Sequence, residues 1–247
     1  MFGRLLTNIG RYLLMLKGMF TKPENFKMYW REFMHQAAEI GIGSLPIVII
    51  ISVFLGAVTT VQTAYQLVSP LIPKATISQI TRDTIILELA PTLTCIVLAG
   101  VVGSKIASEL GNMRVSEQID AIEIMGINTR NYLIAPKILG AFLVIPALIV
   151  ISITLAIWGG RTAGSLSGIL SAQTFDIGLR QNLNLHDIAF AMYKAYTYSF
   201  IISSIGAYFG YFVKGGSFEI GRASTTAVVV SCILILFADY ILASLLL

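Results

Sequence analysis

Residues 109–126 read ELGNMRVSEQIDAIEIMG and hold five charged side chains in a chain that is only 12% charged overall. Gly111 and Asn112 can open a helix here, and Gly126 can close it in the left-handed conformation that glycine tolerates. The sequence therefore predicts a short polar helix over about 112–125.

The predicted helix has two different faces. Val115, Ile119 and Ile122 recur at i, i+4 and i+7 and form one apolar stripe. The opposite face carries a mixed set: Met113, Glu117, Asp120 and Ile124. Such a helix can lie on one surface and present its other face to a second one. The simpler alternative is a solvated helix that only connects two membrane spans.

The composition predicts a membrane protein. Of 247 residues, 56% are hydrophobic, and the mean hydropathy is +0.81, whereas a soluble domain is about 45–50% apolar and about 25% charged. Cys95 and Cys232 lie in apolar runs, and no C-x-x-C or His/Cys cluster occurs, so neither a disulfide framework nor a metal site is expected. Outside the N-terminus, no basic run with interleaved aromatic residues occurs that would indicate nucleic-acid binding.

Residues 1–39 are expected to form an interfacial or elbow segment. Arg11 and Lys17 interrupt the apolar residues near the N-terminus, and no small-residue cleavage site follows, which argues against a signal peptide. On a helical wheel an apolar side faces a polar side that includes Arg4, as in helices that lie in the headgroup layer. The apolar side consists of Phe2, Leu5, Ile9, Tyr12, Leu13, Leu16 and Phe20.

Residues 40–247 are expected to form a five-span domain, because each apolar run reaches the roughly 20 residues that a bilayer crossing requires. The spans are predicted near 45–67, 84–104, 138–160, 188–213 and 223–246. The fold class is therefore an all-α integral membrane protein with an N-terminal interfacial helix, five transmembrane helices and one polar helix between the second and third spans.

The distribution of Lys and Arg predicts the orientation. Six lie in the N-terminal segment, four in the 105–137 connection and two in the 214–222 connection, whereas the 69–84 and 159–187 connections hold two each. This bias places the N-terminus and the 109–126 segment in the cytoplasm and the C-terminus on the outer side.

Three ionisable residues, Glu88, Lys194 and Asp239, lie inside the predicted spans. At 1.5 Å rise per residue, each is roughly 7–12 Å from the predicted outer face. Charges in hydrocarbon are costly unless they are paired or hydrated. We expect a mutual cluster that lines an internal cavity; the alternative is a structural ion network in a membrane scaffold. A different functional class, an ion-coupled secondary transporter or channel, could use the same cluster as a relay.

Small residues recur where helices could approach closely. They form G-x-x-x-G patterns at Gly160, Gly164 and Gly168, and at Gly206 and Gly210. Such patterns serve either packing within one chain or contact between two copies.

The sequence does not favour an enzyme. His35 and His186 are the only histidines, and neither H-E-x-x-H nor G-x-S-x-G occurs. No G-x-x-x-x-G-K-[ST] motif is present to hold ATP phosphates. We therefore expect a non-catalytic subunit that binds no cofactor or metal, with any ATP hydrolysis supplied by another polypeptide.

From about residue 30 onward the chain resembles the MlaE-type permease subunits of MCE-associated phospholipid ABC transporters. The resemblance is carried by Ser44-Leu45-Pro46, Glu88-Leu89-Ala90-Pro91, the long motif from Glu109 to Asn128, Tyr132-Leu133, Pro136, Trp158-Gly159-Gly160 and Gly221-Arg222-Ala223. The chain departs from the family pattern at Leu87, where Arg is often found, at Thr129, where Pro is usual, and at Lys137, where Arg is usual.

The resemblance implies a function for the polar helix and a set of partners. The helix would be a coupling helix that enters a groove of the ATPase through Glu109, Gly111, Met113, Arg114, Glu117, Gln118 and Asp120. The permease would be a homodimer in the bacterial inner membrane, with two ATPases that hold ATP and Mg²⁺ beneath it, an MCE-protein ring outside it and possible accessory cytoplasmic subunits. Phospholipid would pass along the first and second spans, past Phe54, Val61, Gln62 and Tyr65 and the layer formed by Glu88, Lys194 and Asp239.

Overall fold

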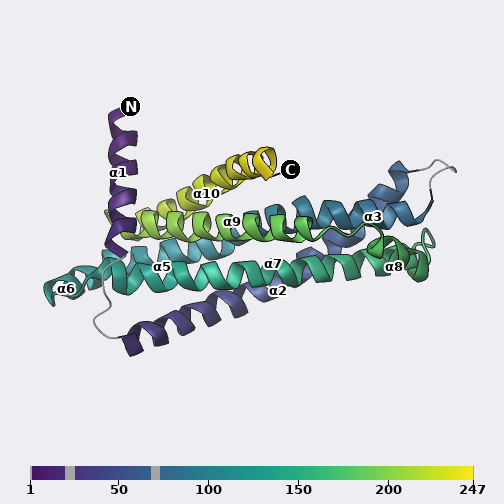
Figure 1. The fold of residues 1–247 in the computed structure, drawn as a ribbon. Helices are drawn as coiled ribbons and strands as arrows, with labels where there is room; N and C mark the ends of the chain where they lie inside the picture. The colour runs from purple at the N-terminus through teal and green to yellow at the C-terminus, as the bar shows by residue number, and fades with distance from the viewer. Residues whose placement is uncertain (1, 20–25, 68–72, 247) are drawn as a thin grey trace. The chain divides into compact units, whose positions relative to one another are not determined.

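The computed structural model describes residues 2–19, 26–67 and 73–246, and all regular secondary structure in these ranges is helical. The side chains of Phe2, Arg4 and Leu5, and the whole of Phe20, lie outside the described part. The helices are α1 Phe2–Met19, α2 Phe26–Gln66, α3 Ala75–Thr84, η1 Ile85–Leu93, α4 Thr94–Leu98, η2 Ala99–Gly103, α5 Ser104–Val115, α6 Gln118–Ile124, η3 Arg130–Ile134, α7 Ala135–Leu166, α8 Ala172–Arg180, α9 Leu185–Tyr211 and α10 Ser217–Leu246 (Figure 1).

Four helical runs are long and apolar enough to cross a membrane. They are Phe26–Gln66, Ala75–Val115, Arg130–Leu166 and Ser217–Leu246. The chain is thus an all-α, multi-pass membrane protein. The remaining expected span, 188–213, coincides largely with α9, in which Lys194 and several tyrosines lower the hydropathy. The number of spans stays a prediction.

The chain divides into two compact units. Unit 1 contains residues 1–42, 96–144 and 198–237, and unit 2 contains residues 43–95, 145–197 and 238–247. The division falls inside α2, α4, α7, α9 and α10, so individual helices contribute to both units.

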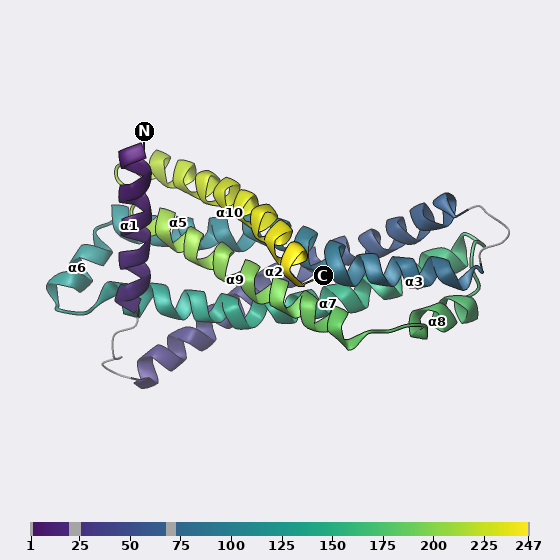
Figure 2. The ribbon, with the colours of Figure 1, turned by 45° about the horizontal axis from the view of Figure 1, so that its top comes forward.

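In unit 1, α1 crosses α5 and the unit 1 part of α9 (Figures 1 and 2). Tyr12 donates a hydrogen bond from its hydroxyl to Ser204 Oγ at 2.8 Å, and Met15 is fully buried. Leu6, Ile9, Leu13 and Leu14 are exposed. The apolar side of α1 is therefore divided: Tyr12 faces the protein, whereas Ile9 and Leu13 remain available to lipid.

The glycine pattern of α9 brings it against the second helical run within unit 1. A Cβ on Gly206 would lie 2.8 Å from Gly103 O, and one on Gly210 would lie 2.6 Å from Ala107 O. Both distances are too short for a side chain. This G-x-x-x-G pattern thus serves packing within the chain, one of the two alternatives that the sequence allows.

In unit 2, α2 and α7 cross with almost no space between their backbones. A Cβ on Gly56 would meet the Ala156 carbonyl, and one on Gly159 would meet the Val53 carbonyl. Gly160 and Gly164 face Thr60, so they too pack within the chain, whereas Gly168 adopts φ +70° in the turn after α7. Close backbone approach is the usual basis of helix association in a bilayer.

The unit 2 part of α2 is polar inside and apolar outside. Its buried stripe includes Ser44, Ser52, Thr60 and Thr63. Ser52 Oγ donates to Ser152 Oγ at 2.7 Å, and Ser152 Oγ lies 3.0 Å from Thr94 Oγ1. The exposed stripe is made of Ile47, Ile50, Phe54, Val58, Val61 and Tyr65. This arrangement suits a helix whose outer face meets hydrocarbon.

Side by side in unit 2, α3 and α8 are joined by the buried Arg82 (Figure 2). Its guanidinium donates to the Leu179 and Gln181 carbonyls, both at 2.7 Å, at the C-terminal end of α8. A cation at this end of a helix satisfies carbonyls that have no helical donor.

Candidate functional site

The 109–126 segment does not form a single helix over 112–125, so the predicted boundaries are wrong at the N-terminal side. The helix that starts in the second apolar run continues through α5 to Val115. Gly111 does not open a helix; it is buried, and its missing side chain leaves room for Ile220 and Val213. The break comes later, where Glu117 adopts φ +60° before α6.

The end of α6 is as predicted. Gly126 has φ +81°, its N–H donates to Glu123 O at 3.0 Å, and the Ile127 N–H donates to Ile122 O at 3.3 Å. This pair of hydrogen bonds is a Schellman motif.

A second set of hydrogen bonds fastens the end of α6 to α9 in unit 1. Glu123 Oε1 accepts from Tyr211 OH and from Thr129 Oγ1, both at 2.9 Å. Burial alone would raise the pKa of Glu123, but these two hydrogen bonds, helped by Arg114 and Arg130, lower it overall. The sequence predicts neither contact: Tyr211 is 88 residues from Glu123, and Thr129, six residues away, lies beyond the end of the helix, where helical periodicity gives no signal.

Arg114 and Asp120 bind each other. Arg114 Nη1 lies 2.6 Å from Asp120 Oδ1, and the guanidinium carbon is 5.8 Å from the centre of the Tyr211 ring. The pair bridges the break between α5 and α6. These two predicted ATPase contacts therefore bind each other within the chain, and Met113 is half-buried beside them.

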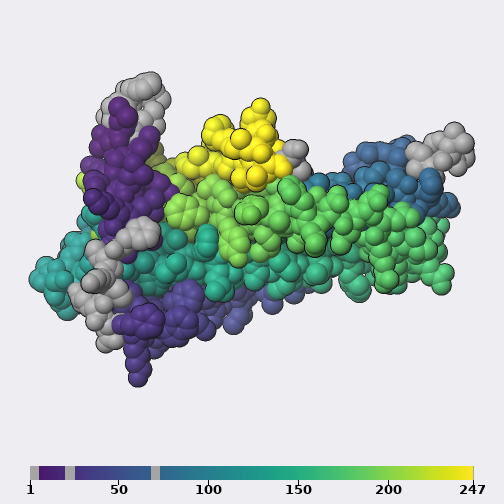
Figure 3. Space-filling model, viewed as in Figure 1, coloured from purple at the N-terminus to yellow at the C-terminus, as the bar shows by residue number. Residues whose placement is uncertain are grey.

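One face of α6 is uncovered in unit 1. It combines a carboxylate, an amide and three apolar side chains, with Ile124 exposed by 87% and Met125 by 67%. The outer face of α6 is defined as Glu117, Gln118, Ala121, Ile124 and Met125; Glu123 is also exposed but is hydrogen-bonded to Tyr211 and Thr129. Figure 3 shows α6 protruding at the left of the view. On the inner side Ile119 is fully buried, flanked by the half-buried Val115 and Ile122.

Glu109 belongs to a different environment. Its Oε1 lies 2.6 Å from Nζ of Lys137, whose side chain is only 3% exposed, although the geometry gives Nζ no well-aligned hydrogen bond. Nearby charges in the same unit form another pair, Lys105 with Glu39 at 2.9 Å. Together these four residues connect α2, α5 and α7. Of the residues predicted to contact the ATPase, Glu109 and Gly111 thus pack within the chain.

The three predicted intramembrane charges meet in unit 2. Lys194 Nζ lies 2.8 Å from Glu88 Oε1 and 2.6 Å from Asp239 Oδ1. It also donates to the Leu87 carbonyl at 2.9 Å and faces the Phe190 ring. Pro91 cannot supply the α-helical N–H that would otherwise reach Leu87 O. The π-helical turn η1 contains both Glu88 and Pro91.

Burial differs sharply among the three charges. The Lys194 side chain is fully buried, whereas the Glu88 side chain is 44% exposed and that of Asp239 is 19% exposed. The cluster therefore presents carboxylate, and not ammonium, to its surroundings.

The predicted wall residues lie on the exposed stripe of α2. Val61, Gln62 and Tyr65 line a shallow hollow of about 500 Å³ together with Ala57, Val58 and Ala163. Phe54 is exposed one turn earlier on the same stripe. Their contact with a substrate stays a prediction.

The two histidines, His35 and His186, lie in different units. His35 Nδ1 is 3.9 Å from Glu39 Oε2, and His186 is exposed. Within residues 2–19, 26–67 and 73–246, no three His, Cys, Asp or Glu side chains come together as a metal-binding group would require.

Comparison with known proteins identifies the family. The family model described as "Permease MlaE" matches residues 33–245. A probable ABC transporter permease protein of Rickettsia bellii is 33% identical over 98% of this chain and 93% of its own. One from Synechocystis is 31% identical over 86% of this chain and 80% of its own. Protein TRIGALACTOSYLDIACYLGLYCEROL 1 of Arabidopsis thaliana is 32% identical over 88% of this chain and 62% of its own. The chain belongs to the MlaE permease family and is a transmembrane permease subunit.

Proposed function

We propose that this subunit moves phospholipids between the inner membrane and an MCE-protein conduit, using energy from a separate ATPase. In the working complex two copies form a homodimer, two ATPase subunits hold ATP and Mg²⁺ on the cytoplasmic side, and an accessory cytoplasmic subunit can accompany them. The N-terminus is cytoplasmic and the C-terminus periplasmic. The chain itself is non-catalytic.

The single observation that carries this proposal is the outer face of α6. A seven-residue helix is held firmly on one side by Ile119, Glu123 and the Arg114–Asp120 pair, while its other side leaves Ile124 and Met125 in the open. Large apolar side chains on a short polar helix are expected to be covered by a partner protein. In an ABC permease the partner on this side is the ATPase, and α6 is the coupling helix.

Two observations support a lipid substrate. The exposed stripe of α2 offers apolar and aromatic side chains, from Phe54 to Tyr65, that suit acyl chains. In the same unit η1 packs against α2 through Ile85, Ala90 and Leu55, and η1 also carries Glu88, whose exposed carboxylate can contact a headgroup. The Arabidopsis relative is named after a glycerolipid.

The role of Lys194 in this mechanism is electrostatic. Two carboxylates in a low-dielectric layer repel each other and are poorly solvated. The buried ammonium between them lowers that cost. ATP-driven closure of the partner would move α6 and, through it, the helices that bound the lipid path.

The coupling role is tested by co-purification of the ATPase and by lipid transfer between proteoliposomes and acceptor vesicles. Met125→Glu on the outer face should reduce ATPase association at least tenfold, because it places a charge in an apolar contact. The control is Glu219→Gln, outside α6, which should leave association unchanged. Full association of the Met125→Glu variant would contradict the proposal.

The same assay separates the competing functional class. Lipid transfer should require ATP and the ATPase and should not respond to a proton or sodium gradient. Transport by the permease alone, driven by such a gradient, would instead indicate an ion-coupled carrier that uses Glu88, Lys194 and Asp239 as a relay.

A further inference from the structure

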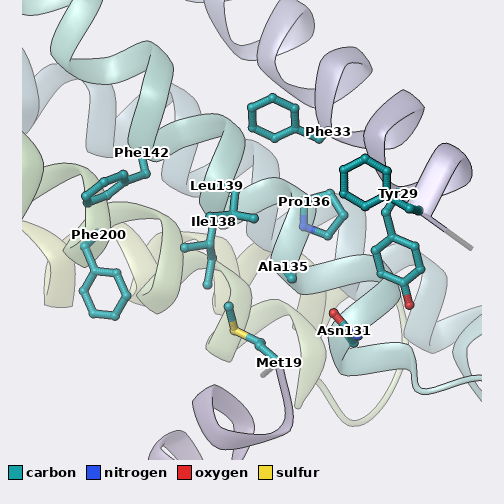
Figure 4. Close-up of a pocket in the computed structure, with 11 residues that line it drawn as sticks. Met19, Tyr29, Phe33, Asn131, Ala135, Pro136, Ile138, Leu139, Phe142 and Phe200 are labelled. Atoms are coloured by element: carbon teal, nitrogen blue, oxygen red, sulfur yellow. The ribbon is translucent and has the colours of Figure 1, made fainter. Parts of the chain in front are cut away.

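A second apolar site lies in unit 1, among residues that the proposed transport path does not use. It is a pocket of about 390 Å³, within the size range of ligand pockets. Tyr29 and Phe33 come from α2, Leu139 and Phe142 from α7, and Phe200 from α9 (Figure 4). Among the described lining residues, Tyr29 and Asn131 are the ones whose side chains carry polar groups.

The pocket is open at its side. Leu139 is 55% exposed, and Phe142 and Phe200 are each 39% exposed. These residues belong to α7 and to the apolar part of α9, where the surroundings are hydrocarbon in a membrane protein. Water would gain almost no hydrogen bonds in such a pocket, so a flexible apolar occupant is favoured.

One end of the pocket carries the positive charge of Arg130, which adjoins the lining residue Asn131. Arg130 donates from Nη1 to the Leu14 carbonyl at 3.3 Å, and its side chain lies over Gly18, next to the lining residue Met19. Lys17 is in the last turn of α1, next to Gly18. None of the described residues that line the pocket is acidic, although Glu123 is close enough to interact with Arg130.

We propose that this pocket holds one acyl chain of a phospholipid from the surrounding leaflet, with the lipid phosphate at the Arg130 end. The apolar lining accounts for the chain, and the Arg130 guanidinium accounts for an anionic head. Tyr29 and Asn131, at the polar end, suit the boundary between hydrocarbon and headgroups, where tyrosine is enriched. A lipid held in this way joins α1, α2 and α7 and does not depend on transport.

The site is tested on the purified full-length permease in phosphatidylcholine vesicles without ATPase. The vesicles contain a small fraction of phosphatidylglycerol that carries a diazirine near the end of one acyl chain. After illumination, labelled peptides are mapped by mass spectrometry. We expect label on the peptides that contain Tyr29, Phe33 and Leu139.

Leu139→Trp should fill the open side and lower this labelling at least fivefold. Leu143→Trp is the matched control, because it is one turn further on the same helix, is 59% exposed and does not line the pocket. Thermal unfolding of both variants checks that they are folded. Leu139→Trp could perturb α7, so a second variant changes the pocket from another helix. Phe33→Ala enlarges the pocket from α2 and should change how the label is distributed among the peptides.

The charged end has its own measurement. Diacylglycerol with the same photoreactive chain should label the pocket several-fold less than phosphatidylglycerol, and Arg130→Gln should remove that difference. Absence of pocket labelling in the wild type, or equal labelling of wild type and Leu139→Trp, would overturn the proposal. Equal labelling by the two lipids would overturn the placement of the phosphate. None of these outcomes bears on transport, because no ATPase is present.

Discussion

Lys194 is the residue on which unit 2 depends most strongly. Its ammonium has no exposure, and it satisfies two carboxylates and one backbone carbonyl. A buried ion pair adds little net stability compared with an apolar core, yet removing one partner leaves an uncompensated charge that costs about 3–5 kcal/mol. The contributions of Lys194, Glu88 and Asp239 to stability can therefore be tested by removing one charge and then restoring the charge balance.

Lys194→Met should lower the unfolding temperature of the detergent-purified subunit markedly, by an amount equivalent to about 3–5 kcal/mol. Glu88→Gln should cost much less, because Glu88 is 44% exposed and can be solvated. Adding Asp239→Asn to Lys194→Met should recover part of the loss. The exposed Lys214→Met is the control. A wild-type unfolding temperature in Lys194→Met would show that the cluster is not a packed ionic network.

Gly56 is a second critical residue, because its position leaves no room for a side chain. Gly56→Ala forces a Cβ into the Ala156 carbonyl, so α2 and α7 must separate, at a cost of about 1–3 kcal/mol. Gly43→Ala on the same helix has nothing within 4 Å and should be neutral or slightly stabilising. Thermal unfolding of the two variants makes the comparison. Equal stability would mean that the helices can separate freely at this point.

At the scale of single helices, α6 shows what the sequence could and could not predict. The apolar stripe through Ile119 and the glycine cap at Gly126 follow from local periodicity and backbone freedom, and both are found. The start of α6 does not follow from these local signals. Gly111 packs against Ile220, and the helix breaks at Glu117 instead. Both depend on tertiary packing that leaves no periodic signal.

The same contrast holds for the ionic sites. The meeting of Glu88, Lys194 and Asp239 could be predicted, because isolated charges at similar depth in hydrocarbon have few stable alternatives to pairing. The pairing of Glu109 with Lys137 was missed. Lys137 lies at the end of the connection, where a charge is solvated in most proteins, and only the structure shows it buried.

The hydrogen bonds of Glu123 predict a pH dependence for the attachment of α6. Its pKa in the folded protein is below the ordinary 4.5. The stabilisation that Glu123 gives to α6 is therefore complete above about pH 4.5. It is lost as the pH falls through the pKa that Glu123 has in the folded protein. Amide exchange of residues 118–127, corrected for intrinsic rates, should rise in that acid range in the wild type.

Glu123→Gln should show faster exchange at neutral pH and no further acid transition. Glu117→Gln, on the exposed face, should behave as the wild type. An acid transition that persists in Glu123→Gln would assign the effect to another group.

At the scale of the whole molecule, one helical run joins the two candidate sites. Residues 75–115 are continuous from α3 through η1, α4 and η2 to α5. The run carries Glu88 in unit 2 and ends at the break before α6 in unit 1. In the proposed mechanism, a displacement of α6 by the ATPase would have a covalent, hydrogen-bonded route toward the charged cluster.

Gly100 in η2 tests this route. Gly100→Pro removes a backbone N–H and introduces a ring clash, which costs about 3 kcal/mol within a helix. We expect the variant to bind the ATPase through an intact α6 and to hydrolyse ATP, but to lose most lipid transfer. Gly100→Ala is the matched control, since a Cβ there has nothing within 4 Å, and it should transfer lipid at the wild-type rate. Wild-type transfer by Gly100→Pro would show that motion reaches the lipid path by another helix, because a kinked run could no longer transmit it.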